Sequence, residues 1–294
     1  MKVDIVIPYV DNKNKEWQEK YFTYFDKCND TFYRTNKDFL RFLLRSIDKN
    51  LSWVNNVFLV VQNCSEVPNY VNTDKVKVVT HDMFIPKEYL PTFNSATIEM
   101  FLWNIPKLAE QFIYFNDDIF VMKPLSYDKF FVNNNVISHY FNRPIPNGYN
   151  SYIVQRSYKT AWGVSAKEMI EKRYISSFLH TCRPFFKSLI KECYNKNKTL
   201  INRWITRTRQ GCNHSIYLFD EYIRFVGRNI NQQAITLEKI INTDNNEQIT
   251  QKFNSGYDTI CLYEFSKTPN IFENKALINL LKTKFQNICK YENK

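Results

Sequence analysis

The segment Phe112–Lys123 (FIYFNDDIFVMK) constrains the fold of this chain more than any other stretch. Its first four residues are apolar and predict a buried β-strand, which gives way to Asn116, Asp117 and Asp118 before apolar residues resume. Adjacent carboxylates between apolar runs are costly to bury unless a cation compensates their charge. Mg²⁺ (or Mn²⁺) prefers oxygen ligands and also binds phosphate, so the segment predicts a metal site for a phosphorylated substrate, with Asp117 and Asp118 as ligands. A metal-free turn is the structural alternative, because Asn and Asp are common turn residues.

Strand-like runs alternate with helical patterns along the first half of the chain. β-Branched, apolar runs at Val3–Val10, Val57–Gln62 and Val76–Thr80 predict further strands. Between the first two, the segment Phe32–Asn50 has an apolar stripe at helical period. This alternation predicts βαβ units and therefore an α/β fold with a mainly parallel sheet flanked by helices.

The length of 294 residues suits one large catalytic α/β domain, 1–294. We expect its core to comprise residues of about 1–140 and 200–270. The segment of about 160–205 is expected to form a helical subregion inserted into this core.

The composition argues against several classes of function. Five dispersed glycines argue against Rossmann and P-loop nucleotide sites, which need clustered glycines. The net charge of +11 suits phosphate-bearing substrates or an anionic membrane surface, whereas the lysines lack the concentrated stripe typical of nucleic-acid binding. The seven cysteines include no CxxC pair, which indicates free thiols. With no signal peptide and no membrane-spanning run in this sequence, we expect a cytoplasmic protein, with peripheral contact to the inner membrane face as a hypothesis from charge.

Several other residues are candidates for substrate binding. Asp11 follows the first strand, where a carboxylate can contact a nucleotide or its metal, or can simply cap the next helix. Asn94 or Ser95 begins a helix whose free N–H groups could bind an anion. Arg34 and Arg45 lie at or along the second helix; such arginines are usually solvated or salt-bridged, but one at a helix start could reach a diphosphate.

His180 is a candidate general base. It lies close to Arg183 and ahead of a basic stretch. A single histidine is more often structural than catalytic, so this assignment needs support from other residues.

Four blocks together resemble the Stealth family of bacterial capsule polymerases and sugar-phosphate transferases. The blocks are Ile5–Trp17, Arg34–Met122, His180 with Arg183-Pro184, and Arg207 with Asn213 and Tyr217. The most specific is the second, in which LPTFNS is followed by Ile98-Glu99 and by YFNDD. The eukaryotic enzyme that tags lysosomal hydrolases with N-acetylglucosamine phosphate is similar.

The resemblance implies a glycosyltransferase-A-like core that moves hexose-1-phosphate from a nucleotide sugar such as UDP-N-acetylglucosamine to an acceptor sugar hydroxyl. The product would be a phosphodiester in a capsular or cell-surface polysaccharide, and the acceptor an oligosaccharide, polysaccharide or lipid-linked chain. A nucleoside monophosphate would leave. The resemblance also implies roles for individual residues. His180 would be the base, and Arg207, with Arg45 or Arg34 as weaker candidates, would stabilise the developing charge. Asp117 and Asp118 would hold the metal, Asn94, Asn116 and Asn213 would orient phosphate or sugar, and Asp11 would contact the donor.

Two alternatives stay open. A conventional metal-dependent glycosyltransferase would use the same fold but attack the anomeric carbon and release a nucleoside diphosphate. A non-catalytic carbohydrate- or nucleotide-binding protein is the other. The chain departs from the family pattern at Asn12, Cys182, Gly211 and Leu262-Tyr263-Glu264.

Overall fold

The fold is described from a computed structural model of the chain. The structure describes residues 2–25, 37–138, 140–144, 149–165, 174–208, 214–232, 235–263 and 270–293. All statements below about contacts and side chains refer to these ranges.

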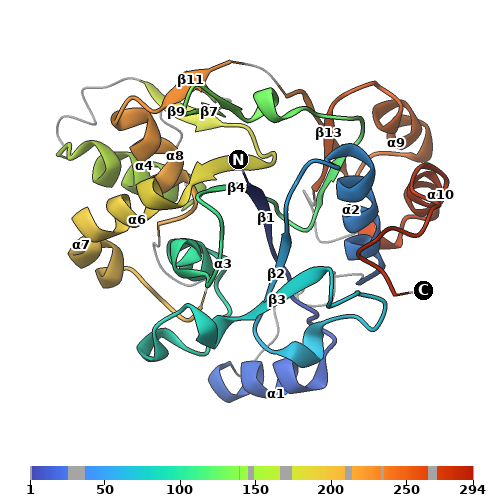
Figure 1. Cartoon of the computed structure of the whole chain (residues 1–294), viewed down its shortest axis with the longest axis horizontal. Helices are drawn as coiled ribbons and strands as arrows, with labels where there is room; N and C mark the ends of the chain where they lie inside the picture. The colour runs from blue at the N-terminus through green and yellow to red at the C-terminus, as the bar shows by residue number, and fades with distance from the viewer. Residues whose placement is uncertain are drawn as a thin grey trace.

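A five-stranded sheet in the order β10-β4-β1-β2-β3 forms the centre of the molecule (Figure 1). Strands β4, β1, β2 and β3 are parallel to one another, and β10 is antiparallel at the edge beside β4. Their bounds are β1 (Val3–Pro8), β2 (Val57–Val61), β3 (Val76–Thr80), β4 (Gln111–Tyr114) and β10 (Arg183–Phe186). Strands β2 and β4 are buried along their whole length, as expected for a sheet covered on both faces.

Strand β1 lies between β2 and β4, with Ile5 opposite both Val57 and Ile113. The chain therefore proceeds outward in one direction through β2 and β3 and returns to the other side of β1 as β4. Ligands bind at such a reversal of strand order, beyond the carboxyl ends of the strands. Asp11 and the Asn116–Asp118 turn both follow strands that end at this position.

Helices α2 (Lys37–Asn50) and α3 (Ser95–Met100) lie on opposite sides of the central strands (Figure 1). Helix α2 is strongly amphipathic, and Leu40, Leu43 and Ile47 on its apolar face are completely buried. Burial of these large aliphatic side chains stabilises the sheet by roughly 1.5–3 kcal/mol each.

Smaller sheets and helices surround the core. The helices are α1 (Lys15–Tyr24), α4 (Tyr149–Trp162), α6 (Lys187–Lys196), α7 (Lys198–Arg203), α8 (Tyr217–Phe225), α9 (Asn246–Phe253) and α10 (Lys275–Lys284). The strands are β5 (Ile119–Val121), β6 (Phe131–Val132), β7 (Asn135–Ser138), β8 (Tyr140–Pro144), β9 (Tyr174–Phe178), β11 (Asn229–Asn231), β12 (Leu237–Ile241) and β13 (Thr259–Tyr263). The sheet β12-β13-β5 continues directly from the end of β4 through the Asn116–Asp118 turn.

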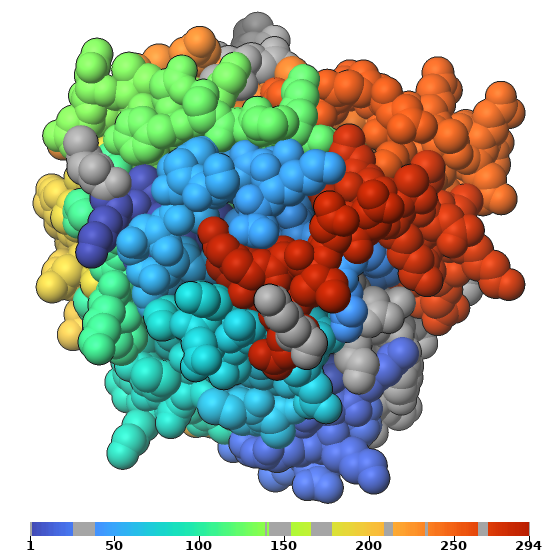
Figure 2. All heavy atoms as spheres, turned by 45° about the vertical axis from the view of Figure 1, so that its right-hand side comes forward, coloured from blue at the N-terminus to red at the C-terminus, as the bar shows by residue number. Residues whose placement is uncertain are grey.

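The C-terminal residues pack back onto the N-terminal half. Figure 2 shows them in red, against α2 in light blue and the cyan segment below it. The Asn293 N–H donates to the Tyr70 carbonyl at 2.7 Å, and Glu292 pairs with Val71 across an isolated bridge. This contact fixes the segment that follows β2.

The predicted α/β class is confirmed, and β1, β2 and β3 lie where the β-branched runs placed them. The segment of about 160–205 was expected to be helical, and it does contain α6 and α7. It also contains β9 and β10, because Arg183–Phe186 pairs with β4 instead of continuing a helix.

None of the helices in the described ranges has the length and apolar content that a bilayer-spanning segment requires. The five cysteines that the structure describes are unpaired thiols, as expected.

Candidate functional site

The turn that carries Asn116, Asp117 and Asp118 joins the end of β4 to the start of β5. The Ile119 N–H donates to the Asn116 carbonyl at 3.3 Å, and the Leu262 N–H of β13 donates to the Asp118 carbonyl at 3.0 Å. All three side chains are half-buried between residues that are completely buried. The structure therefore holds two carboxylates in a fixed turn at the carboxyl end of the central sheet.

Strand β10 brings His180 to this turn. Arg183 pairs with Tyr114 in antiparallel register, so the residues before Arg183 extend past the end of β4. His180 Nε2 lies 3.3 Å from Asn116 Nδ2 and 3.9 Å from Asp118 Oδ1. The direction of the hydrogen bond between His180 and Asn116 depends on the tautomer of the imidazole. Three predicted site residues thus lie together.

Arg183 holds the segment that carries His180. Its guanidinium forms a buried ion pair with Asp220 of α8 and donates to the Leu179 carbonyl at 2.7 Å. Burial raises the pKa of Asp220 to about 6, although the adjacent Arg183 opposes the shift. The position of His180 therefore depends on a charge pair that links β10 to α8.

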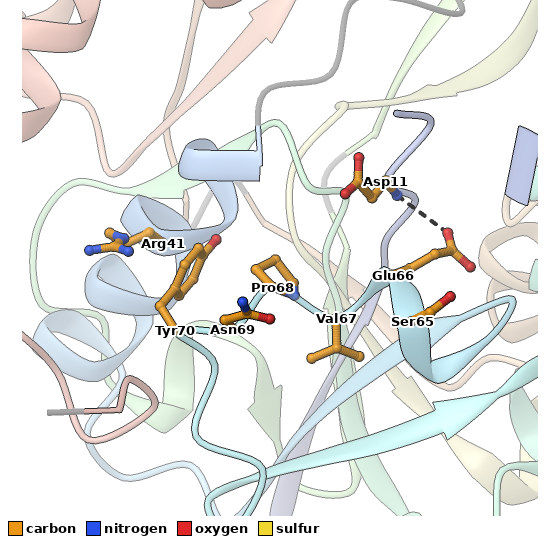
Figure 3. Close-up of a pocket in the computed structure, with 8 residues that line it drawn as sticks. All are labelled: Asp11, Arg41, Ser65, Glu66, Val67, Pro68, Asn69 and Tyr70. Atoms are coloured by element: carbon orange, nitrogen blue, oxygen red, sulfur yellow. Dashed lines mark hydrogen bonds between the residues drawn. The ribbon is translucent and has the colours of Figure 1, made fainter. Parts of the chain in front are cut away.

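Asp11 lies at the edge of a cavity of about 360 Å³ beyond the ends of β1 and β2 (Figure 3). Its N–H donates to Glu66 Oε2 at 3.3 Å. Across the cavity, the Arg41 guanidinium lies 4.1 Å from the centre of the Tyr70 ring. The lining residues are Asp11, Arg41, Ser65, Glu66, Val67, Pro68, Asn69 and Tyr70.

Five of the buried side-chain atoms without hydrogen-bond partners in the described ranges lie at these strand ends or line the cavity. They are Tyr9 Oη, Asn12 Oδ1, Arg41 Nε, Gln62 Oε1 and Asn63 Nδ2. An unsatisfied buried polar group costs roughly 1–3 kcal/mol, so such a group is expected where a ligand binds. Burial, with added repulsion from the charges of Asp11 and Asp117, raises the pKa of Tyr9. Tyr9 therefore lies within electrostatic range of both the cavity and the Asn116–Asp118 turn.

Asp118 is suited to hold a divalent cation. Its Oδ1 is buried and has no hydrogen-bond partner in the described part of the chain. One donor atom each from Asp118, His180 and Cys261 lie within 4.8 Å of one another. A buried carboxylate oxygen next to further metal-binding groups is a suitable cation ligand.

Arg207 and Asn94 form a second group. Arg207 Nη2 donates to the Glu88 carbonyl at 3.0 Å, and its guanidinium lies 5.7 Å from the Tyr24 ring centre. Asn94 is only 4% exposed and donates to the carbonyl oxygens of Thr206 and Thr208. Asn94 therefore contacts the residues that flank Arg207, whereas the sequence suggested direct contact with phosphate or sugar. Ser95 is exposed at the first turn of α3.

Arg45 has a structural role. It donates from Nε and Nη2 to the Glu292 carboxylate and from Nη1 to the carbonyl oxygens of Phe285 and Gln286. All three nitrogens are engaged in holding the C-terminal segment, so the suggested contact with phosphate is not available to it. Arg34 and Asn213, the remaining predicted site residues, lie outside the described residues.

Sequence reasoning missed three residues near the site. Glu66 and Tyr70 line the cavity, but they lie in an irregular segment with no motif. The Asn63–Glu66 spacing, which forms a capping box here, was the one local signal for Glu66. Cys261 was noted only as one of seven thiols, because nothing in the sequence indicates that β13 pairs with β5.

Two solved structures of glycosyltransferases align with most of the chain at low similarity. Galactosyltransferase LgtC, in complex with donor and acceptor sugar analogues, aligns over 95% of both chains at 10% identity and a TM-score of 0.45. Mouse xyloside xylosyltransferase 1 aligns over 89% of this chain and 97% of its own, at 11% identity and a TM-score of 0.44. Both similarities are distant.

Curated proteins found by sequence are more similar to the chain than these solved structures are. Capsular polysaccharide phosphotransferase LcbA of Aeromonas hydrophila is 31% identical over 76% of this chain and 67% of its own length. Capsular polysaccharide phosphotransferase fcs1 of Haemophilus influenzae is 32% identical over 72% of this chain and 61% of its own. The chain thus spans about two thirds or less of the length of these relatives. Residues 33–139 match Stealth protein CR2, conserved region 2. On this match and these identities, the chain belongs to the Stealth family.

Proposed function

We propose that this chain transfers a sugar-1-phosphate from a nucleotide sugar to a hydroxyl of a saccharide acceptor. The observation that carries the proposal is the group formed by Asn116, Asp118 and His180 at the end of β4, with distances of 3.3 and 3.9 Å to His180 Nε2. The relatives named capsular polysaccharide phosphotransferase support the reaction class. The net charge of +11 suits an anionic donor and a phosphodiester-linked acceptor.

The cavity beside Asp11 is our candidate for the nucleotide end of the donor. It lies beyond the carboxyl ends of β1 and β2, beside the reversal of strand order between β1 and β4, and the Tyr70 ring and the Arg41 guanidinium offer a flat apolar face and a fixed positive charge. The diphosphate would then extend from Asp11 toward the Asn116–Asp118 turn. The direct pairing of β1, which leads to Asp11, with β4, which leads to the turn, supports this path.

In the proposed reaction, the acceptor oxygen attacks the phosphorus atom that carries the sugar. A new P–O bond forms to the acceptor, and the P–O bond to the nucleoside monophosphate breaks, with the electron pair going to the leaving phosphate. His180, in its neutral form, takes the proton of the acceptor hydroxyl at Nε2, where the hydroxyl replaces the contact with Asn116. Asn116 holds the imidazole before the acceptor binds, and Arg207, on the family resemblance, is our candidate for stabilising the developing charge. A divalent cation held by Asp118, with Asp117 beside it, would neutralise charge on the diphosphate.

Identification of the released nucleotide tests the proposal. The purified protein is incubated with Mg²⁺, a panel of nucleotide sugars that includes UDP-N-acetylglucosamine, and a capsule-type acceptor. We expect release of the nucleoside monophosphate. His180→Ala should lower kcat by roughly 10²- to 10⁴-fold, the usual contribution of a general base.

Asp118→Asn should also abolish turnover, whereas Asp74→Asn, a substitution at an exposed carboxylate, should not. Release of the nucleoside diphosphate instead would show attack at the anomeric carbon. That result would identify a conventional glycosyltransferase and overturn the proposed reaction.

A further inference from the structure

Cys261 brings a sulfur atom to the turn that carries Asp118. It lies on β13, opposite Ile119 of β5, and is completely buried. One donor atom each from Cys261, Asp118 and His180 lie within 4.8 Å of one another. The three residues come from β13, the turn between β4 and β5, and the turn before β10.

Sheet pairing fixes the backbones of Asp118 and Cys261, and His180 lies three residues before a paired strand. The Leu262 N–H donates to the Asp118 carbonyl at 3.0 Å, next to Cys261, and β10 pairs with β4 from Arg183 onward. Ligand atoms around a tetrahedral Zn²⁺ are roughly 3–4 Å apart, as its bond lengths of about 2.0–2.3 Å require. The donor atoms, which all lie within 4.8 Å of one another, therefore need to approach by about 1 Å at most. The side chains of His180 and Asp118 are 34% and 24% exposed.

The chemistry of this group differs from that of a magnesium site. Mg²⁺ takes oxygen ligands almost exclusively, whereas a sulfur, an imidazole nitrogen and a carboxylate oxygen together select Zn²⁺ or a similar cation. Three protein ligands with a fourth position open to solvent is a common zinc arrangement. The buried Asp118 Oδ1 lacks a hydrogen-bond partner among the described residues, so it can bind a cation without losing a hydrogen bond.

We propose that Asp118, His180 and Cys261 form a binding site for a thiophilic dication such as Zn²⁺, and that its occupancy inhibits the enzyme. The binding follows from the three donors alone. The inhibition rests on the proposed function, because a His180 nitrogen that ligates a metal cannot also accept the proton of the acceptor hydroxyl. Zn²⁺ would also compete for Asp118 with the cation that the donor diphosphate needs.

Cobalt binding tests the site without any donor or acceptor. The full chain is titrated with Co²⁺, and a sulfur-to-cobalt charge-transfer band in the near ultraviolet is recorded, followed by displacement with Zn²⁺. We expect a one-to-one complex whose band is lost in Cys261→Ser. Zn²⁺ affinity should fall at least about 100-fold in Cys261→Ser and in His180→Gln, since even the loss of an outer hydrogen-bond partner costs roughly 10- to 100-fold.

Cys64→Ser is the matched control, because Cys64 is exposed and lies in a different segment. It should leave the band and the affinity unchanged. His180→Gln alters a partly exposed side chain and keeps the test valid if the buried Cys261→Ser variant fails to fold. The proposed site would be overturned if the natural protein gave no band. It would also be overturned if Cys261→Ser and His180→Gln gave a band as strong as that of the natural protein.

Inhibition is measured separately. Turnover with Mg²⁺ is followed at increasing Zn²⁺, and each variant is compared with its own rate without zinc. We expect Zn²⁺ to inhibit the natural protein and Cys64→Ser equally, and to inhibit Cys261→Ser at least about 100-fold less effectively. Cobalt binding without zinc inhibition would retain the site and overturn its inhibitory role. Cobalt binding in a protein that releases a nucleoside diphosphate would retain the site while the proposed reaction fails.

Discussion

The side chain of Asn94 donates hydrogen bonds to the carbonyl oxygens of Thr206, at 3.3 Å, and Thr208, at 2.8 Å, the two neighbours of Arg207 in the chain. Its Oδ1 also accepts from the Ala96 N–H at 3.1 Å and so caps helix α3. One buried amide thus joins the start of α3 to a segment more than a hundred residues later. Its contribution to activity should come through the position of Arg207.

Two substitutions at Asn94 separate these roles. Asn94→Ala removes the cap, worth about 1 kcal/mol, and leaves two carbonyl groups without their donor, so stability should fall by roughly 1–3 kcal/mol. Asn94→Ser keeps a cap acceptor but cannot donate to both carbonyl groups, so it should retain more stability than Asn94→Ala while kcat still falls. Denaturant unfolding and steady-state kinetics measure both effects. The control is Ser52→Ala at an exposed position outside this group, and an Asn94→Ser variant with natural kcat would contradict the positioning role.

The buried pair between Arg183 and Asp220 makes a second prediction. Asp220→Asn leaves the Arg183 charge buried and unpaired, which should cost roughly 3–5 kcal/mol in unfolding free energy. The double variant Arg183→Met/Asp220→Leu should recover much of this stability, because it removes both charges. It should not recover kcat, because Arg183 no longer donates to the Leu179 carbonyl beside His180.

Chemical denaturation and kcat measured on the same preparations check this prediction. Lys20→Met, which breaks an exposed ion pair on α1, is the control and should change stability little. Equal recovery of stability and kcat in the double variant would show that Arg183 does not position His180.

Local sequence was sufficient for β1 to β4 and for the turn that carries Asp118. β-Branched runs, such as Val57–Val61, favour a buried strand wherever they lie, and two carboxylates between apolar runs can only be placed at a strand end. These features depend on neighbouring residues, so they can be predicted before the fold is known.

Partners far apart in sequence could not be predicted in the same way. Arg45 is tied to Glu292, 247 residues later, by the packing of the C-terminal segment, and no local pattern distinguishes it from an arginine that binds phosphate. Cys261 approaches Asp118 only because β13 pairs with β5. His180 is an intermediate case: the family resemblance indicated its importance, but the register of β10 against β4 decides which atoms it contacts.

The cavity beside Asp11 predicts how donor affinity depends on Tyr70. If the nucleotide base stacks on this ring, Tyr70→Ala should weaken donor binding by 1–3 kcal/mol, or roughly 5- to 150-fold, the usual range for base stacking on an aromatic side chain. Tyr70→Phe keeps the ring and should bind nearly normally. Calorimetry with the nucleotide sugar measures the affinity, and Tyr257→Ala, at an exposed tyrosine outside the cavity lining, is the control. Unchanged affinity in Tyr70→Ala would place the nucleotide elsewhere.

A buried carboxyl on α8 predicts part of the pH dependence of stability. Burial raises the pKa of Glu221 to about 7 from an ordinary value of 4.5, and its Oε1 has no hydrogen-bond partner among the described residues. Between these two pH values the folded chain therefore holds a proton that the unfolded chain has lost, so this group lowers stability as pH rises from about 4.5 to above 7.

Glu221→Gln should remove that loss. The amide oxygen can still accept from Trp162 Nε1, as the carboxylate does at 2.9 Å, while the contact to Arg224 at 3.4 Å is given up. We expect similar unfolding free energies for the two proteins near pH 5 and a more stable variant near pH 8, by at most on the order of 3 kcal/mol. The unfolding free energy of the variant should still fall somewhat as pH rises, because burial also raises the pKa of Glu66 to about 7. Guanidinium unfolding across this pH range measures the difference in unfolding free energy, with exposed Glu247→Gln as the control. If the unfolding free energy of Glu221→Gln depended on pH as steeply as that of the natural protein, Glu221 would ionise normally in the folded protein.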